Sequence, residues 1–361
     1  MNILFLPHNI ASMQAITAEA LNEMEGINAK CLTGNTHKYQ TPNESTILLP
    51  NRFISRKNPF KWYYAQWNYA RQLKKWIKWA DVLHYTWASA FVNAKDLLWA
   101  NKWNKPIFIE WVGSDIRNPE ILSAINPYYK QAFNNGYEYY DLEKSQHKKK
   151  VQKHFSQINA IPLLCPEMSL YLDQKLYADH LLLMQRVNIS EFIAEFPSVQ
   201  NSKPIIIHSP SAKIAKGSNL IIKVIEELKK DFDFEFLLLH DMKREDVLRS
   251  MRKADIFLDQ IILGSYGMAT MEALAYGKPV MCYLLPEVFD AGLPAECPIV
   301  NTNPDNLKEQ LINLISNPQL RHDIGKQSRA YVEKYHDAEK IAKQLFHIYS
   351  EALKSKQIQH V

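Results

Sequence analysis

The stretch that decides the fold is DQIILGSYGMATMEALAYGKPV, residues Asp259 to Val280. The apolar run just before it predicts a strand, which leads into a polar turn that contains glycine. An amphipathic helix then begins near Met268 and ends at Gly277, and a new apolar run opens at Val280. A strand, a glycine turn, a helix and a second strand in this order are typical of an α/β domain with a parallel sheet.

The beginning of the predicted helix has the chemistry of an anion site. Free N–H groups and the helix dipole attract negative charge there, and glycine lets a ligand approach the backbone. Glu272 lies early enough in the helix to reach a hydroxyl beside the bound anion. An anion site beside a carboxylate fits a nucleotide or a nucleotide sugar. The alternative is that Glu272 only complements the helix dipole.

A second stretch, Pro204 to Ser218, reads PIIIHSPSAKIAKGS and repeats the pattern. A short strand ends near His208, a turn begins at Ser209, and Lys213 and Lys216 stand at the entry to a helix. Two lysines and several free amides at one strand end predict a diphosphate site. Ligands of open α/β sheets also bind at this edge of the sheet. The alternative is a solvated basic turn.

Together these stretches resemble the C-terminal domain of retaining GT-B glycosyltransferases, family 4-like, of the bacterial cell-surface polysaccharide and glycolipid type. The resemblance implies that Lys213 and Lys216 contact the donor diphosphate and that Glu272 holds the ribose. A further glutamate that the family often carries is replaced by Gly264, and Asp259 or Gln260 is the candidate substitute. The remaining donor-binding candidates are Ser209, Ser265, Tyr266, Gly267 and Met268.

Strand and helix patterns alternate along both halves of the chain, which predicts two doubly wound Rossmann-like domains of GT-B type facing a deep cleft. We expect an acceptor-side domain over residues 1–196 and a linker of turn-forming residues up to 203. We expect a nucleotide-sugar-binding domain over 204–335 and a C-terminal helix, 336–361, that crosses back towards the first domain.

In the first half, the turn Gly113 to Arg117, GSDIR, follows a predicted strand and resembles a cleft-facing turn of bacterial GT-B enzymes. Many of these enzymes carry a histidine just before the glycine, where this chain has Val112. Asp115 is a catalytic candidate that could bind a sugar hydroxyl, although an aspartate in such a turn commonly caps a helix. His84, at a strand end, is a second catalytic candidate.

Residues 52–79 form an unusual basic and aromatic stretch. It contains eight Lys and Arg and no acid, and all eight Trp of the chain lie between Trp62 and Trp111. Residues 1–200 carry 22 basic and 17 acidic side chains, so the formal net charge of +5 belongs to this half. The stretch fits docking on an anionic membrane surface, binding to nucleic acid, or an ordinary helix whose aromatics pack in the core. We expect the membrane surface as a partner and no nucleic acid.

Composition and missing motifs narrow the function. The chain has 361 residues, 47% hydrophobic, with four scattered cysteines and no apolar run of about 18 residues. It lacks the glycine motifs of dehydrogenases and P-loop proteins and any zinc-ligand cluster. Asp231 and Asp233 form a DxD, but they lie where a helix turns into a strand, so no metal is expected.

We therefore expect a metal-independent, retaining hexosyltransferase with no cofactor. Its donor would be a nucleotide sugar, a UDP-sugar in preference to a GDP-sugar, and its acceptor a glycan or a lipid-linked molecule. A GT-B nucleotide-sugar 2-epimerase is an alternative, and so is a non-catalytic relative that docks on membranes or partners. The expected location is the cytoplasm, with peripheral binding to the inner face of the plasma membrane.

Overall fold

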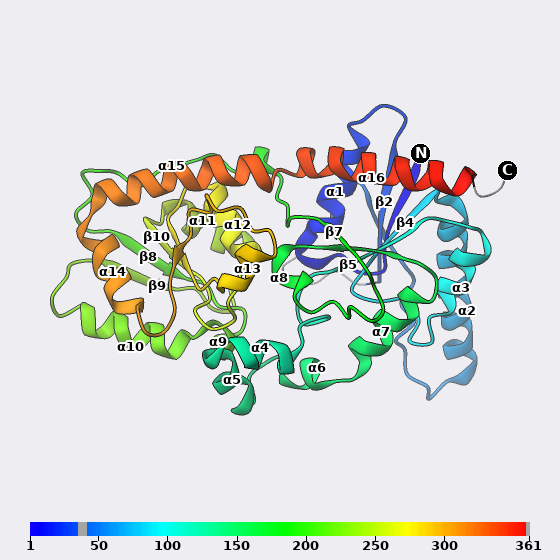
Figure 1. The fold of residues 1–361 in the computed structure, drawn as a ribbon, viewed down its shortest axis with the longest axis horizontal. Coiled ribbons are helices and arrows are strands. Elements are labelled where there is room, and N and C mark those ends of the chain that lie inside the picture. The colour runs from blue at the N-terminus through cyan, green and yellow to red at the C-terminus, as the bar shows by residue number, and fades with distance from the viewer. Residues whose placement is uncertain (35–41, 359–361) are drawn as a thin grey trace.

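The computed structural model describes residues 1–34 and 42–358. It consists of two lobes, each built on its own parallel sheet, with helices on both faces (Figure 1). Helices cover both faces of each sheet, so the strands carry apolar side chains on both faces and these form the core. The architecture confirms the predicted fold class, two Rossmann-like α/β domains of GT-B type.

The first sheet has seven strands in the order β3-β2-β1-β4-β5-β6-β7, and all described pairs are parallel. The strand order reverses between β1 and β4, and a ligand crevice is expected at such a switch point. The strands are β1 Asn2–Leu6, β2 Asn28–Thr33, β3 Thr46–Leu48, β4 Val82–Thr86, β5 Ile107–Trp111, β6 Ile161–Leu164 and β7 Leu181–Leu182.

The second sheet has five parallel strands in the order β12-β11-β10-β8-β9. Its switch point lies between β8 and β10, which are the strands in front of the two stretches singled out above. The strands are β8 Ile205–His208, β9 Glu235–Leu238, β10 Ile256–Leu258, β11 Val280–Cys282 and β12 Val300–Asn301.

Helices connect the strands of each sheet. In the first lobe they are η1 Ile10–Ser12, α1 Met13–Asn22, α2 Pro59–Trp79, α3 Lys95–Lys102, α4 Pro119–Ile125, α5 Pro127–Asn134, α6 Tyr140–Lys144, α7 His147–Ser156, α8 Pro166–Ser169 and η2 Ile189–Glu191. In the second lobe they are α9 Lys213–Lys216, α10 Ser218–Leu228, α11 Arg244–Lys253, α12 Met268–Ala275, α13 Pro286–Asp290, α14 Leu307–Ser316 and α15 Pro318–Tyr335. None of the described helices contains a stretch long and apolar enough to cross a bilayer.

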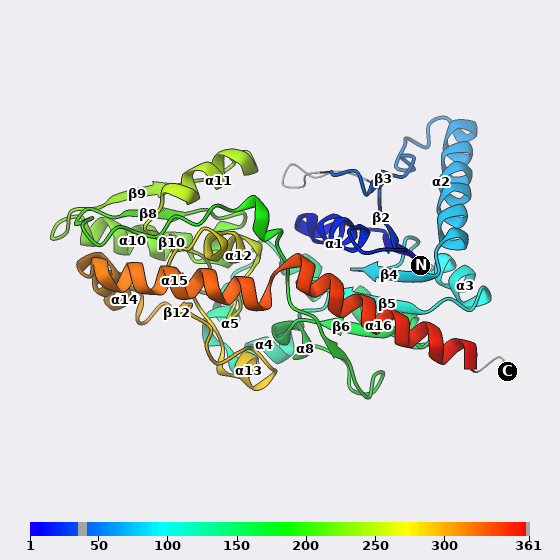
Figure 2. The same ribbon diagram turned by 90° about the horizontal axis from the view of Figure 1, so that it is seen from above.

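The chain passes between the lobes twice, and the two crossings are hydrogen-bonded to each other. The amide of Val187 donates to the carbonyl of His336 at 2.9 Å, and the amide of Ala338 donates to the carbonyl of Val187 at 3.0 Å. Helix α16, Ala338–Ile358, then packs on the first lobe against α1 (Figures 1 and 2). The C-terminal helix was expected from residue 336, and α16 begins at Ala338, because His336 caps the end of α15.

Two local expectations are refined by the structure. The helix expected after Lys213 and Lys216 is α10, which begins at Ser218, and Gly217 separates it from the short α9 with a left-handed φ of 77°. Asp231 and Asp233 lie between α10 and β9, as expected of a turn, and Asp233 pairs with Lys203 at 2.9 Å on the surface.

Candidate active site

A cavity of about 450 Å³ lies between the two lobes, at the carboxyl ends of both sheets. Its wall from the second lobe includes residues after β8, after β9 and after β10. Its wall from the first lobe includes residues after β1, β4 and β5, where the topology predicts a crevice. Most of the expected donor-binding residues line it: Ser209, Lys216, Ser265, Tyr266, Gly267, Met268 and Glu272.

Lys216 reaches this cavity from the last residue of α9. Its Nζ is paired with the buried carboxylate of Asp259, whose second oxygen accepts a hydrogen bond of 2.6 Å from Thr270 Oγ1. Burial by itself lowers the pKa of Lys216, but the ion pair with Asp259 outweighs it, so the pKa lies above the ordinary lysine value. Lys216 is therefore a fixed positive charge in the wall of the cavity. Asp259 holds that lysine and is not among the lining residues, whereas Gln260 is.

Lys213 occupies a different position, although it is only one turn away. It is solvent-exposed and does not line the cavity. The amides of Ile214 and Ala215 donate to the carboxylate of Glu138 at 2.7 and 3.0 Å. Glu138 belongs to the segment between α5 and α6 of the first lobe, so these two amides are occupied across the domain boundary and are not free.

Glu272 lies in the second turn of α12 and is paired with Arg244, the first residue of α11. Arg244 Nε and Nη2 both donate to Oε1 of Glu272, at 3.0 and 2.6 Å. Both groups line the cavity. Burial raises the pKa of Glu272, and the guanidinium opposes this increase only in part. Within the described residues Oε2 has no hydrogen-bond partner, so it can accept one from a ligand. Sequence analysis missed Arg244, because its partner is distant in the chain.

The loop between β10 and α12 owes its shape to Gly264. This glycine has a left-handed φ of 79°, and a Cβ there would lie 2.5 Å from Cγ of Leu285. Asn126, at the junction of α4 and α5, donates to the carbonyl of Ile262 at 2.8 Å and joins this loop to the first lobe. The glutamate that the resembling family often carries at this position therefore has no room here. Gln260, which donates to the carbonyl of Ser265, is the polar side chain in the nearby wall.

In the first lobe, the turn after β5 presents Val112, Gly113 and Ser114 to the cavity. The Asp115 carboxylate turns back and accepts hydrogen bonds from the amides of Val112 and Gly113, at 3.2 and 2.7 Å. It is buried and does not line the cavity. Burial raises the pKa of Asp115 to about 7 despite these hydrogen bonds. Asp115 therefore holds its own turn, and it does not cap the next helix either, because the cap of α4 is Asn118.

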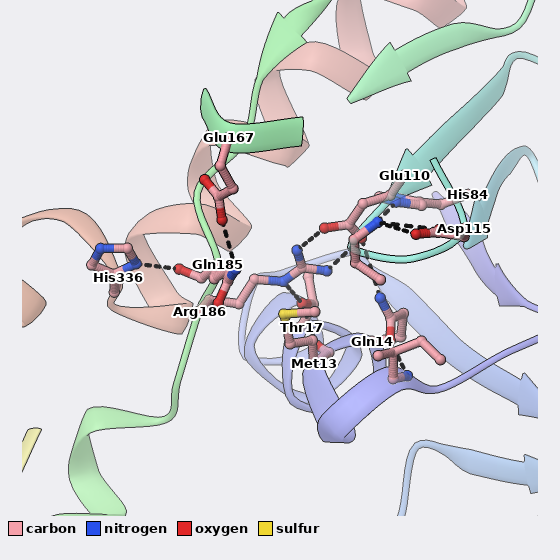
Figure 3. A network of polar contacts seen from close by, with 12 residues as sticks. Met13, Gln14, Thr17, His84, Glu110, Asp115, Glu167, Gln185, Arg186 and His336 are labelled. Atoms are coloured by element: carbon pink, nitrogen blue, oxygen red, sulfur yellow. Dashed lines mark hydrogen bonds and ion pairs between the residues drawn. The ribbon is translucent and has the colours of Figure 1, made fainter. Parts of the chain in front are cut away.

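His84 is fully buried in β4 and belongs to a network of polar side chains (Figure 3). Its Nδ1 is 2.6 Å from the hydroxyl of Tyr349 on α16, and its Nε2 is 3.2 Å from Glu110. Burial lowers the pKa of His84, and Glu110 opposes this decrease. His84 therefore joins the return helix to the sheet and makes no contact with the cavity.

The same network positions the backbone at the start of α1. Arg186 forms a two-pronged ion pair with Glu110 and donates to Thr17 Oγ1 at 2.6 Å (Figure 3). Gln14 donates to Glu110 at 3.2 Å and accepts a 2.7 Å hydrogen bond from the amide of Ile10, which lines the cavity. Burial alone would raise the pKa of Glu110, but the Arg186 charge holds it well below the ordinary value.

A buried histidine supports the strand end that precedes Lys216. His208 Nδ1 is 2.9 Å from the carbonyl of Leu258, and Nε2 is 2.8 Å from Ser218 Oγ. The carbonyl can only accept, so Nδ1 carries the proton and Nε2 accepts from the serine. Burial lowers the pKa of His208 to about 4. The neutral ring therefore ties β8 to β10 and to the start of α10.

A second cavity, of about 680 Å³, lies in the first lobe next to the interdomain cavity. The two share Ile10 and Trp87 in their walls. Arg52 lines the second cavity, and its guanidinium lies 4.6 Å from the centroid of the Tyr69 ring. Other lining residues are Pro7, His8, Asn9, Phe53, Ser89 and His147.

Part of the second lobe matches a known protein family. Residues 234–331 match the family model described as glycosyl transferases group 1. An uncharacterized glycosyltransferase of Methanocaldococcus jannaschii is 28% identical over 150 residues, which cover 33% of this chain and 40% of that protein. The match therefore spans less than half of the relative's length.

Solved structures match nearly the whole chain. A glycosyltransferase from Rickettsia africae has a TM-score of 0.65 at 14% identity, covering 98% of both chains. Anabaena HepE, solved in complex with UDP and glucose, has a TM-score of 0.61 at 13% identity, covering 97% of this chain and all of that one. Such low identity shows the fold alone. The chain therefore has the GT-B fold, and residues 234–331 of its second lobe match the glycosyl transferases group 1 model.

Proposed function

We propose that this protein transfers a sugar from a nucleoside diphosphate sugar to an acceptor held by the first lobe. The observation that carries the proposal is that Lys216, Glu272 and the start of α12 form one wall of the interdomain cavity. A buried cation, a helix N-terminus and a carboxylate with one oxygen available match the diphosphate and the ribose of such a donor. The group 1 match over residues 234–331 and the GT-B fold support the same activity.

The chemistry that this wall can perform is stabilisation of a leaving group. Breaking the bond between sugar and phosphate builds positive charge on the sugar and negative charge on the diphosphate. Lys216 and the amides around Met268 are held in place before the reaction, so they stabilise that negative charge without reorganisation. In the proposed reaction no metal is needed, and the departing phosphate accepts the proton of the acceptor. Retention of configuration is part of the proposal and rests on the resemblance to retaining enzymes.

The second cavity is the proposed entrance for the acceptor. It adjoins the donor cavity at Ile10 and Trp87, so an acceptor bound there would present a hydroxyl towards the donor sugar. Aromatic rings such as Trp87 and Tyr69 suit the apolar faces of sugars or lipids, and Arg52 adds a positive charge. We propose a glycan or a lipid-linked molecule as the acceptor. UDP is the proposed nucleotide, as in the HepE complex.

The experiment is a thermal-shift screen against UDP, GDP, ADP and CMP, followed by calorimetric titration of the stabilising nucleotide. Lys216→Met and Lys213→Met form a matched pair, because only the first lysine lines the cavity. Loss of a charge-assisted hydrogen bond, worth about 1.5–3 kcal/mol, predicts roughly 10- to 100-fold weaker binding for Lys216→Met and little change for Lys213→Met.

Glu272→Gln provides a second test that does not depend on the stability of the Lys216 variant. Removing Lys216 leaves Asp259 buried without its cation, so the melting temperature without nucleotide is measured for each variant. Glu272→Gln keeps the shape of the side chain but removes its charge, so it should weaken binding of UDP, the proposed nucleotide. CMP, GDP and ADP serve as comparisons. Stabilisation by none of the nucleotides, or equal losses in both lysine variants, contradicts the proposed donor site.

A further inference from the structure

Helix α2 carries an exposed face that the rest of the described molecule does not cover. Its buried side consists of Tyr69, Leu73 and Ile77 at intervals of one turn, which pack into the core of the first lobe. The opposite side presents residues at intervals of three and four, which is the spacing of one helical face. These residues are Phe60, Tyr63, Tyr64, Trp67, Arg71, Lys74, Lys75 and Lys78.

The first half of this face is aromatic. Phe60 is 87% exposed, Tyr63 67%, Tyr64 63% and Trp67 57%, and Phe53 in the preceding loop is 76% exposed. Single exposed apolar residues are common, but an exposed group of large aromatic rings on one helix marks an interaction surface. Packing of these rings into the core, which the sequence allowed, is therefore excluded for this part of the stretch.

The charges around the aromatic group all have one sign. Arg56, Lys57 and Lys61 flank its beginning and are exposed, and Arg71, Lys74 and the following lysines continue it. No Asp or Glu occurs between residues 52 and 80. Arg56 and Arg71 lie over the rings of Trp62 and Trp67, at 5.3 and 5.2 Å from the centroids. A partner of this surface must therefore be negatively charged and must also accept aromatic rings.

We propose that this face of α2 docks on an anionic lipid membrane surface. Aromatic side chains that are apolar at one end and polar at the other settle at the level of the lipid headgroups, and lysines and arginines pair with anionic headgroups. Base stacking on nucleic acid is less suitable, because single strands are bound in positively charged grooves, whereas these rings stand on the exposed face of one helix.

The docked face adjoins the cavity proposed for the acceptor. Arg52, Phe53 and Tyr69 line that cavity, and Gln66 of α2 donates to the carbonyl of Arg52 at 2.7 Å. In Figure 2 the beginning of α2 and helix α11, at the edge of the interdomain cavity, project to the same side of the molecule. Docking through α2 would therefore bring Phe53, which is exposed and lines the second cavity, to the headgroups, where the lipid-linked acceptor of the proposed function would lie.

The test is cosedimentation of the full chain with large vesicles of phosphatidylcholine, with and without phosphatidylglycerol. We expect binding only when phosphatidylglycerol is present, and release at high salt, because ions screen exposed charges. Each basic residue near an anionic surface contributes about fivefold to partitioning, so Lys57→Gln/Lys61→Gln should bind roughly 25-fold more weakly. Lys230→Gln/Lys253→Gln, which removes the same charge from exposed sites of the second lobe, is the matched control.

A second variant, Phe60→Ser/Tyr64→Ser/Trp67→Ser, tests the rings. All three side chains are exposed, so the melting temperature should not change while vesicle binding is lost. Equal binding to both kinds of vesicle, or equal losses in both lysine pairs, overturns the proposal. Tighter binding to a single-stranded oligonucleotide than to vesicles, lost in the aromatic variant, assigns the surface to nucleic acid and also overturns it. Vesicle binding is measured without nucleotide, so it does not depend on the donor site.

Discussion

Replacing Gly264 by alanine should destabilise the second lobe strongly, although it adds only one methyl group. The residue has a φ of 79°, which costs an L-amino acid about 1–2 kcal/mol. The new Cβ would lie 2.5 Å from Cγ and 2.6 Å from Cδ1 of Leu285 and 3.1 Å from Nδ2 of Asn126. Overpacking of this kind costs about 1–3 kcal/mol.

The neighbours cannot easily move away from the added methyl group. The amide of Leu285 donates to the carbonyl of Gly264 at 3.0 Å, so the loop and the end of β11 are joined. The two contributions together predict a loss of roughly 2–5 kcal/mol in the free energy of unfolding. With an m-value of about 2 kcal/mol/M for a domain of this size, the urea midpoint should fall by roughly 1–2.5 M.

The assay follows urea unfolding by circular dichroism and by tryptophan fluorescence. All eight tryptophans lie between residues 62 and 111, so fluorescence reports on the first lobe alone, whereas circular dichroism reports on both. Gly267→Ala is the control, because that glycine has a φ of −128° and open space where a Cβ would stand. We expect the dichroism midpoint to fall only for Gly264→Ala. Equal midpoints for the two variants would refute the argument from loop geometry.

Three further predictions concern the domain boundary, a buried ion pair and pH. Glu138→Gln should lower the free energy of unfolding in urea by up to about 1 kcal/mol, because the amides of Ile214 and Ala215 then lose their negatively charged partner; Asp141→Asn, an exposed charge nearby, should not. Arg186→Met should lower the free energy of unfolding in urea by about 3–5 kcal/mol, because Glu110 then stays buried without its cation, and adding Glu110→Leu should recover part of the loss. The pKa of His208 is about 4 in the folded protein and near 6.5 in the unfolded chain, so its contribution to stability is present above pH 6.5 and is lost as pH falls towards 4. In that window the wild type should lose up to about 3 kcal/mol in the free energy of unfolding relative to His208→Gln. Parallel pH profiles of the two proteins would contradict this.

Much of the second lobe follows from local rules. The strand before Asp259, the helix from Met268 and the turn at Gly277 all appear in the structure within two residues of the expected positions. Glycine, proline and the spacing of apolar residues act over a few residues, so they can be interpreted without knowledge of the fold. The same rules located both strand ends that form the cavity, because parallel strands bring their carboxyl ends to one edge of a sheet.

The candidate site was less predictable than the strands around it. Lys213 and Lys216 are equivalent in the sequence, but only Lys216 enters the cavity, because the α9 turn directs Lys213 to solvent. Arg244 pairs with Glu272 across 28 positions, and Glu138 approaches α9 from the other lobe. No local pattern indicates contacts between residues so far apart in the sequence, because these contacts depend on how sheets and lobes pack.

The sequence by itself determined the two parallel sheets, the two strand ends that line the interdomain cavity and the basic, aromatic character of residues 52–79. Each of these depends on residue type and spacing over one or two elements. Only the tertiary structure decided which polar groups face the cavity and which support it. It turned Asp115 towards its own loop, placed His84 against the return helix and left Trp67 exposed while burying Tyr69. The physical reason is that the direction of a side chain is set by the neighbours that pack against its element, and those neighbours are distant in the chain.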